Sequence, residues 1–204
     1  MLALSERDIR ELYTMKDCLK DVEEAFRAHQ EGKTITPVRI ALPAGNEGAS
    51  TLYMPAFVEP AKVMGIKIVS VFPDNPKKGR PAIRGITLLT DAETGKHLAL
   101  MDATYLTVLR TGAISGVATK YLARKDARVC ALLGAGAQSV GQIQGAMEVC
   151  NLEEIRIWNR TREKAERLKK TIRETWPNWP GTISVFGRPE DAARGADVIL
   201  CATR

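Results

Sequence analysis

Long apolar runs and histidine are scarce in this sequence of 204 residues. No apolar stretch approaches the ~20 residues that a membrane-spanning helix needs, and the charged N-terminal stretch MLALSERDIRELY lacks a signal-peptide pattern. Its two histidines have no partner at metal-ligand spacing, which argues against a zinc site. We therefore expect a cytoplasmic protein with neither a membrane nor a metal partner.

Paired cysteines are also lacking. The four cysteines lie far apart and form no C-x-x-C motif, while Cys130 and Cys201 fall inside apolar, strand-like runs. This pattern predicts reduced, buried cysteines. The net charge of +6 is modest, and the densest basic stretch, residues 160–173, has interleaved acids and apolar residues at helical spacing. That stretch is typical of a solvated helix face and argues against a nucleic-acid partner.

The hydrophobic pattern changes twice along the chain. Residues 5–31 predict helices, with Ser5 as N-cap, and residues 36–100 predict a meander of antiparallel or mixed strands. A helix is expected over 103–124, where the small residues of TGAISG permit close backbone packing or close ligand approach. From residue 126, strands alternate with helices, which predicts a parallel sheet. We expect an α/β protein with an α+β domain over 1–125 and a Rossmann-type domain over 126–204.

The last strand-like run, VILCA, is apolar on both faces, as a buried central strand would be. A doubly wound domain normally has six strands, whereas this sequence supplies four. The sequence is therefore expected to stop partway through that domain.

The segment LLGAGAQSVG matches two glycines of a dinucleotide-binding loop, Gly134 and Gly136. It follows a strand and opens a helix, so Gly134 can form the tight turn and Gly136 can admit a pyrophosphate at the helix N-terminus. Ser139 stands where a third glycine or alanine is usual. The alternative is a glycine turn in a domain that binds no nucleotide.

The end of the second strand of this domain selects between NAD and NADP. NAD sites place an acid there, but residues 158–162 read Trp-Asn-Arg-Thr-Arg. Arg160 and Arg162 can pair with a 2′-phosphate that a carboxylate would repel. We therefore expect NADP(H) to be favoured, with NAD(H) possible. The alternative is that both arginines are surface residues at a helix start.

Three basic residues of the first domain sit among apolar neighbours: Arg39 in TPVRIAL, Lys67 in the strand GIKIVSVF and Arg110 in YLTVLRTGAISG. Each alone can be a surface cation whose stem packs on apolar residues. Together they suggest a pocket for a carboxylate, in which a desolvated lysine would have a lowered pKa suited to acid–base chemistry.

Five segments, in order along the chain, carry a resemblance to a known family: TPVRIAL, LYMPAF, GIKIVSVFPDNP, LLTDAETGKHLALMDATYLTVLRTGA and ALLGAGAQ. The sequence resembles the ornithine cyclodeaminase/mu-crystallin family over essentially its whole length. That resemblance implies a homodimer with a substrate-binding and dimerisation domain followed by a Rossmann domain. It also implies hydride transfer at the α-carbon of a small amino or cyclic imino acid.

The resemblance also implies residue roles. Arg39, Lys67 and Arg110 would surround the substrate carboxylate as catalytic and binding residues, and Met54 would line the pocket. The cofactor would contact the following residues: Arg110, Thr111, Gly134, Gly136, Ala137, Gln138, Asn159, Arg160, Thr161, Arg162 and Thr203.

Two departures from the family pattern bear on the reaction. Residues 82–84 read Ala-Ile-Arg where reductase-like members often carry Ser-His-Gln, so that histidine cannot donate a proton here. The aspartate that cyclodeaminases use would fall beyond residue 204. The favoured reaction is ornithine to proline, or pyrroline-2-carboxylate to proline. The alternatives are an alanine dehydrogenase and a non-catalytic, mu-crystallin-like protein that binds NADPH or another ligand.

Overall fold

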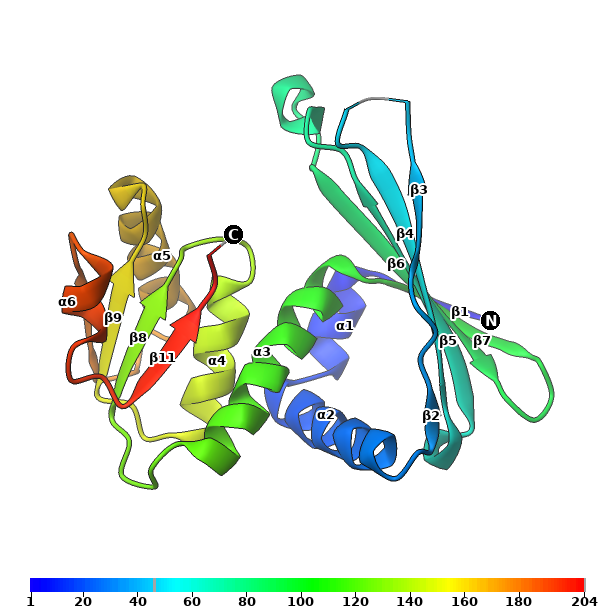
Figure 1. Cartoon of the computed structure of the whole chain (residues 1–204), viewed down its shortest axis with the longest axis horizontal. Helices are drawn as coiled ribbons and strands as arrows, with labels where there is room; N and C mark the ends of the chain where they lie inside the picture. The colour runs from blue at the N-terminus through cyan, green and yellow to red at the C-terminus, as the bar shows by residue number, and fades with distance from the viewer. Residues whose placement is uncertain (46, 204) are drawn as a thin grey trace. The chain divides into compact units, whose positions relative to one another are not determined.

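The computed structural model describes residues 1–45 and 47–203, which fall into two compact units (Figure 1). The first comprises Met1–Thr14 and Glu24–Thr107, and the second Met15–Glu23 and Val108–Arg204. Most of the helix expected over 103–124 therefore belongs, by its contacts, to the second unit. Within the described residues, no helix combines the length and apolarity needed to cross a bilayer.

The first unit is built on a seven-stranded sheet in the order β1-β7-β6-β5-β4-β2, with β3 also pairing with β4. The strands are β1 (Leu2–Leu4), β2 (Thr34–Ile35), β3 (Ile40–Pro43), β4 (Ser50–Val58), β5 (Val63–Val71), β6 (Ile83–Asp91) and β7 (His97–Asp102). The meander of β4 to β7 confirms the predicted antiparallel strands. The short parallel strand β1, which pairs with β7, was missed. Two 3₁₀ turns lie between strands of this sheet: η1 (Glu59–Ala61) connects β4 to β5, and η2 (Asn75–Lys78) lies between β5 and β6.

Helices lie on one side of this sheet only, among the described residues (Figure 1). They are α1 (Glu6–Leu12) and the second half of α2 (Met15–Gln30). Ser5 caps α1 as predicted, in a reciprocal capping box with Asp8. On the opposite face, apolar side chains such as Met64 and Ile86 are exposed, and no described helix of this unit covers them (Figure 1).

The second unit contains the predicted parallel sheet, in the order β10-β9-β8-β11. Its strands are β8 (Val129–Leu133), β9 (Glu154–Trp158), β10 (Thr182–Val185) and β11 (Val198–Cys201). Its helices are α3 (Thr104–Leu122), α4 (Ser139–Val149), α5 (Arg162–Thr175) and α6 (Pro189–Ala193). Numbered along the chain, the strand order is 3-2-1-4, the first four positions of a doubly wound dinucleotide domain.

The strand β11 lies at the edge of the sheet within the described residues, and its Ile199 is 49% exposed. The run VILCA, whose apolarity is typical of a central strand, is therefore an edge strand here, as expected for the last strand of this sequence. The expectation of buried cysteines was wrong in part: Cys18 and Cys130 are buried, Cys150 is half-buried and Cys201 is exposed. Strand position, which apolarity alone does not reveal, accounts for the exposure of Cys201.

Helices α3 and α4 cross at four glycines, with backbone against backbone. An added Cβ on Gly112 would lie 1.9 Å from the carbonyl oxygen of Gly141, and one on Gly145 would lie 2.1 Å from that of Gly112. Gly116 is equally confined, since its Cβ would lie 2.8 Å from the carbonyl oxygen of Gly145. The small residues of TGAISG therefore serve close helix packing, and any side chain here would push the helices apart.

We predict that Gly145→Ala destabilises the protein. In an exposed helix interior the same substitution would stabilise the helix by about 1 kcal/mol, because alanine has the higher helix propensity. Overpacking of this kind typically costs about 1–3 kcal/mol, and a clash with backbone atoms places the change at or above that range. Urea denaturation measures the free energy of unfolding. Gly187→Ala is the control, because its added Cβ would meet nothing within 4 Å. Equal free energies of unfolding for the two variants would contradict the close backbone packing of α3 against α4.

Candidate functional site

The first unit contributes a row of side chains that runs across the sheet. Lys67 of β5 pairs with Met54 of β4 on one side and with Thr87 of β6 on the other. Directly paired residues share one face of a sheet, so the three side chains are neighbours. All three positions are half-buried, which corrects the expectation that Lys67 lies in a fully buried strand. Thr87 was missed, because its place beside Lys67 depends on strand register.

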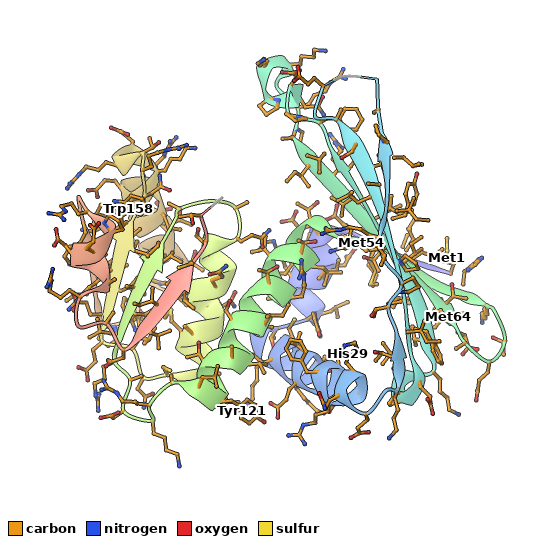
Figure 2. The ribbon with its side chains drawn as sticks, viewed as in Figure 1. Met1, His29, Met54, Met64, Tyr121 and Trp158 are labelled. Atoms are coloured by element: carbon orange, nitrogen blue, oxygen red, sulfur yellow. The ribbon has the colours of Figure 1, made fainter. Side chains whose placement is uncertain are left out.

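Arg39 lies in the loop just before β3, not inside a strand as expected, and its side chain is exposed. The strand β3 begins at Ile40, which pairs with Tyr53, so Arg39 comes directly before the first paired residue of that strand. Figure 2 shows Met54 on the side of the sheet that carries α1, and Met64 on the opposite side.

The second unit contributes the glycine loop between β8 and α4. Gly134 has a φ of +112°, and a Cβ there would lie 2.6 Å from the backbone of Ala202, so only glycine fits. A Cβ on Gly136 would meet nothing within 4 Å. The first glycine therefore packs against the end of β11, beside Thr203, and the second faces open space.

Two polar side chains hold this loop in shape. Asn159 accepts a hydrogen bond from the backbone N–H of Ala135 at 3.0 Å and donates one to the carbonyl oxygen of Thr161 at 2.8 Å. Ser139, buried at the start of α4, donates its hydroxyl to the carbonyl oxygen of Gly134 at 3.1 Å. The serine at the usual third glycine position thus closes the turn, and Asn159 ties the loop to the end of β9.

The turn that follows β9 presents the predicted cations. Arg160 is exposed and makes no hydrogen bond or ion pair with any residue that the structure describes. Arg162 lies 3.5 Å from Glu166 in an exposed pair one helical turn apart, which is a weak restraint. Thr161 is the N-cap of α5 but forms no side-chain cap. The guanidinium of Arg160 is therefore available to an anionic group.

Arg110 and Thr111 precede Gly112 directly on α3. The Arg110 side chain reaches solvent, yet the desolvation by surrounding protein lowers the pKa of its guanidinium, with only the buried Cys18 acting in the opposite direction. Arginine keeps its charge at neutral pH all the same. Arg39 and Lys67 belong to the first unit and Arg110 to the second, so the three-cation pocket stays a prediction.

The loop of the second unit has the features that a dinucleotide pyrophosphate needs. Space is open beside Gly136, and the α4 N-terminus has no side-chain cap to compete for its N–H groups. The Oε1 atom of Gln138 is buried and has no donor within the described chain, so a bound ligand can supply one. Ala137, next to it, is exposed. These residues fit the pyrophosphate of a dinucleotide.

Known proteins share this arrangement over the whole chain. The Delta(1)-pyrroline-2-carboxylate reductase of Bacillus cereus is 38% identical over 203 residues, which are 100% of this chain and 62% of that protein. The Thermococcus litoralis Delta(1)-pyrroline-2-carboxylate reductase, solved with NADH and L-proline, matches with a TM-score of 0.91 and 35% identity. An archaeal alanine dehydrogenase dimer with bound NAD matches with a TM-score of 0.87 and 33% identity.

Both solved structures are covered only in part, although each match includes 100% of this chain. The chain spans 62% of the Thermococcus reductase and 60% of the archaeal alanine dehydrogenase. The sequence model of the ornithine cyclodeaminase/mu-crystallin family matches residues 1–204. This protein therefore belongs to the ornithine cyclodeaminase/mu-crystallin family.

Proposed function

We propose that this protein is an NAD(P)(H)-dependent oxidoreductase that reduces a small cyclic imino acid, with pyrroline-2-carboxylate giving proline as the leading case. The observation that carries the proposal is the row of Met54, Lys67 and Thr87, which places a half-buried cation on the interior strand β5 of the sheet. The glycine loop supports the cofactor requirement. The reductases of Bacillus cereus and Thermococcus litoralis support the substrate class.

The proposed division of labour follows from the charges. When bound, the nicotinamide ring supplies or accepts the hydride. Arg39 holds the substrate carboxylate, Lys67 adds a second positive charge and a transferable proton, and Met54 shapes the apolar wall. The resemblance to the family adds Arg110 of α3 to this set as a third cation for the substrate carboxylate. Since no histidine stands at residues 82–84, Lys67 is the proposed proton donor to the imine nitrogen.

The cofactor preference is a separate proposal. The exposed guanidinium of Arg160 supports recognition of a 2′-phosphate and therefore NADP(H), assisted by Arg162 and Thr161. The two solved relatives described above were obtained with NADH and with NAD. NAD(H) is thus the alternative cofactor for this chain.

Other reactions are kept as alternatives. The similarity to an archaeal alanine dehydrogenase supports oxidation of alanine as the second candidate. Ornithine cyclodeamination and ligand binding without turnover are the remaining two. A cyclodeaminase would return its hydride and consume no reduced cofactor, whereas a reductase would oxidise NADPH when the imine is added.

We also propose a homodimer formed through the uncovered face of the first sheet. The exposed apolar side chains on that face are Ile35, Ile40, Leu42, Met64 and Ile86. Register places all of them on the face opposite Lys67. Several exposed apolar side chains on one face of a sheet are typical of an interaction surface, and the archaeal relative is a dimer.

Lys67→Ala is predicted to abolish most turnover of pyrroline-2-carboxylate with NADPH, by about 10²–10⁴-fold, because it removes a proton donor. NADPH affinity, followed by nicotinamide fluorescence, should stay unchanged. The control is Lys96→Ala, an exposed lysine in the β6–β7 turn. An unchanged rate would remove Lys67 from the mechanism, and no imine reduction by the unsubstituted protein would refute the proposed reaction.

Two neighbouring substitutions separate charge recognition from loop support. Arg160→Ala should weaken NADPH binding about tenfold more than NADH binding, because it removes a charge-assisted contact to the 2′-phosphate. Asn159→Ala should weaken both cofactors equally, because it loosens the glycine loop. Fluorescence titration with each cofactor measures all four affinities. Equal effects of Arg160→Ala on the two cofactors would argue against NADP selectivity.

Ile86→Glu is predicted to convert the dimer to a monomer in sedimentation equilibrium, since it places a charge in the apolar interface. Ile83→Glu is a matched control on the same strand. Its side chain is 42% exposed, against 41% for Ile86, but it points to the other face. If both variants remained dimeric, the interface would lie elsewhere.

A further inference from the structure

A cavity of about 480 Å³ opens at one end of the first sheet, where three connections meet. They are the segment between α2 and β2, the η1 turn after β4, and the β6–β7 turn. Phe57, which lines the cavity, pairs with Met64 on the face opposite Met54 and Lys67 (Figure 2). The cavity is therefore separate from the row proposed to bind the substrate. Its volume falls in the range of about 300–1,000 Å³ that is typical of small-molecule sites.

Backbone hydrogen bonds join the three connections around the cavity. The N–H of Glu59 donates to the carbonyl oxygen of Lys33 at 3.0 Å, and the N–H of Ala92 donates to that of Lys62 at 2.9 Å. Lys62 has a φ of +50°, and it is the only non-glycine residue of the described chain with a positive φ. Glycine would adopt this backbone without strain, but it would remove an ammonium group from the wall. Such strain is often found at ligand-binding sites, where the surrounding contacts hold it.

The charged side chains of the cavity carry both signs. Lys33 pairs with Glu31 at 2.6 Å, and Lys62 pairs with Glu93 at 2.8 Å. Exposed pairs of this kind contribute little stability, so either lysine can exchange its partner for an anionic group of a ligand. Glu59 makes no side-chain hydrogen bond or ion pair with any residue that the structure describes. The pKa of Lys33 is raised chiefly by its hydrogen bond to Glu31, and Glu59 adds to the effect, so Glu59 lies within electrostatic reach of that ammonium group.

The rest of the cavity wall is apolar. It is formed by Phe57, Pro60 and Ala92, of which Phe57 and Ala92 are half-buried. The aromatic ring of Phe57 lies at the end of β4, directly before the turn that carries Glu59. One small space therefore combines two ammonium groups, a carboxylate without a partner and an apolar surface.

We propose that this cavity binds a small α-amino acid with an apolar side chain, in its zwitterionic form. Lys33 and Lys62 hold the carboxylate of the ligand, Glu59 accepts hydrogen bonds from its ammonium group, and Phe57 packs on its side chain. A ligand with a single charge would leave either the lysines or Glu59 without a counter-charge. This site is distinct from the reaction proposed above and does not depend on it.

Fluorine NMR gives a direct reporter, because the chain has four phenylalanines and Phe57 alone among them lines the cavity. The full chain with Lys67→Ala is labelled with 4-fluorophenylalanine and titrated with L-proline. The substitution removes the central cation of the substrate row, and a Phe57→Leu variant identifies the signal. We expect the Phe57 signal to shift saturably while the other three stay in place. A Phe57 signal that does not move would overturn the proposal.

Two analogues of proline test whether both charges are read. Pyrrolidine retains the ammonium group alone, and cyclopentanecarboxylate retains the carboxylate alone. Each should bind at least about tenfold more weakly than L-proline, because each lacks one charge-assisted contact. If either analogue bound as tightly as proline, the cavity would not be a zwitterion site.

Substitutions in the wall test the assigned contacts. Glu59→Gln and Lys33→Met should each weaken binding of L-proline about tenfold. Lys33 is chosen over Lys62 because the left-handed backbone of Lys62 makes a change there harder to interpret. Lys96→Met is the control, since Lys96 is an exposed lysine of the β6–β7 turn outside the cavity wall, and it should leave the affinity unchanged. Unchanged affinity in both wall variants would refute the assignment.

The cavity also borders the face proposed for dimerisation, because Phe57 pairs with Ile35. The titration is therefore repeated with Ile86→Glu added, and the same shift of the Phe57 signal is expected. A shift seen only with Ile86→Glu would mean that a second copy fills the cavity, and the amino-acid site would be rejected. Since no turnover is measured, failure of the proposed reaction would leave these results unchanged.

Discussion

The contact between α3 and α4 is the constraint on which the second unit depends. The two helices approach so closely that an added Cβ would lie about 2 Å from a carbonyl oxygen of the facing helix. This separation is possible only because the four facing residues are glycines. Arg110 and Thr111 lie two residues and one residue, respectively, before Gly112, the first of these glycines. On the partner helix, α4, Ser139 is the first residue, and the glycine loop comes directly before it. The crossing therefore fixes where a cation and a hydroxyl from α3 stand relative to the loop, without any bond between their side chains.

The loop itself has a second layer of support, made of hydrogen bonds. Asn159 bridges the loop to the end of β9, and Ser139 closes the turn onto Gly134. Both residues depart from the simplest dinucleotide pattern, which has glycine at one position and an acid at the other. A neutral amide at the end of β9 keeps a carboxylate away from the turn. In the function proposed above, recognition of the adenosine ribose would then fall to its neighbours, and to Arg160 above all.

Most of the fold could be predicted from the sequence, because period-two and helical patterns mark the elements and because strands alternating with helices imply a parallel order. Ser5 was recognised as a cap because its partner lies three residues away. The strand β1 was missed because three residues show no period. The burial of Lys67 was overestimated, because an apolar run looks the same in a central strand covered on one face as in a strand covered on both faces. Cys201 was placed inside for the same reason.

The two halves of the candidate site rest on different physical determinants. Met54 stands beside Lys67 because the β4–β5 hairpin turns at residues 59–62, and the register then fixes every pair along both strands. A one-residue slip would turn Lys67 to the opposite, apolar face, so the row is protected by the packing of the whole sheet. The cofactor selectivity proposed above would depend, in contrast, on exposed residues of a single turn, where substitutions cost little stability. We therefore expect the preference between NAD(H) and NADP(H) to change more readily in this family than the position of the lysine.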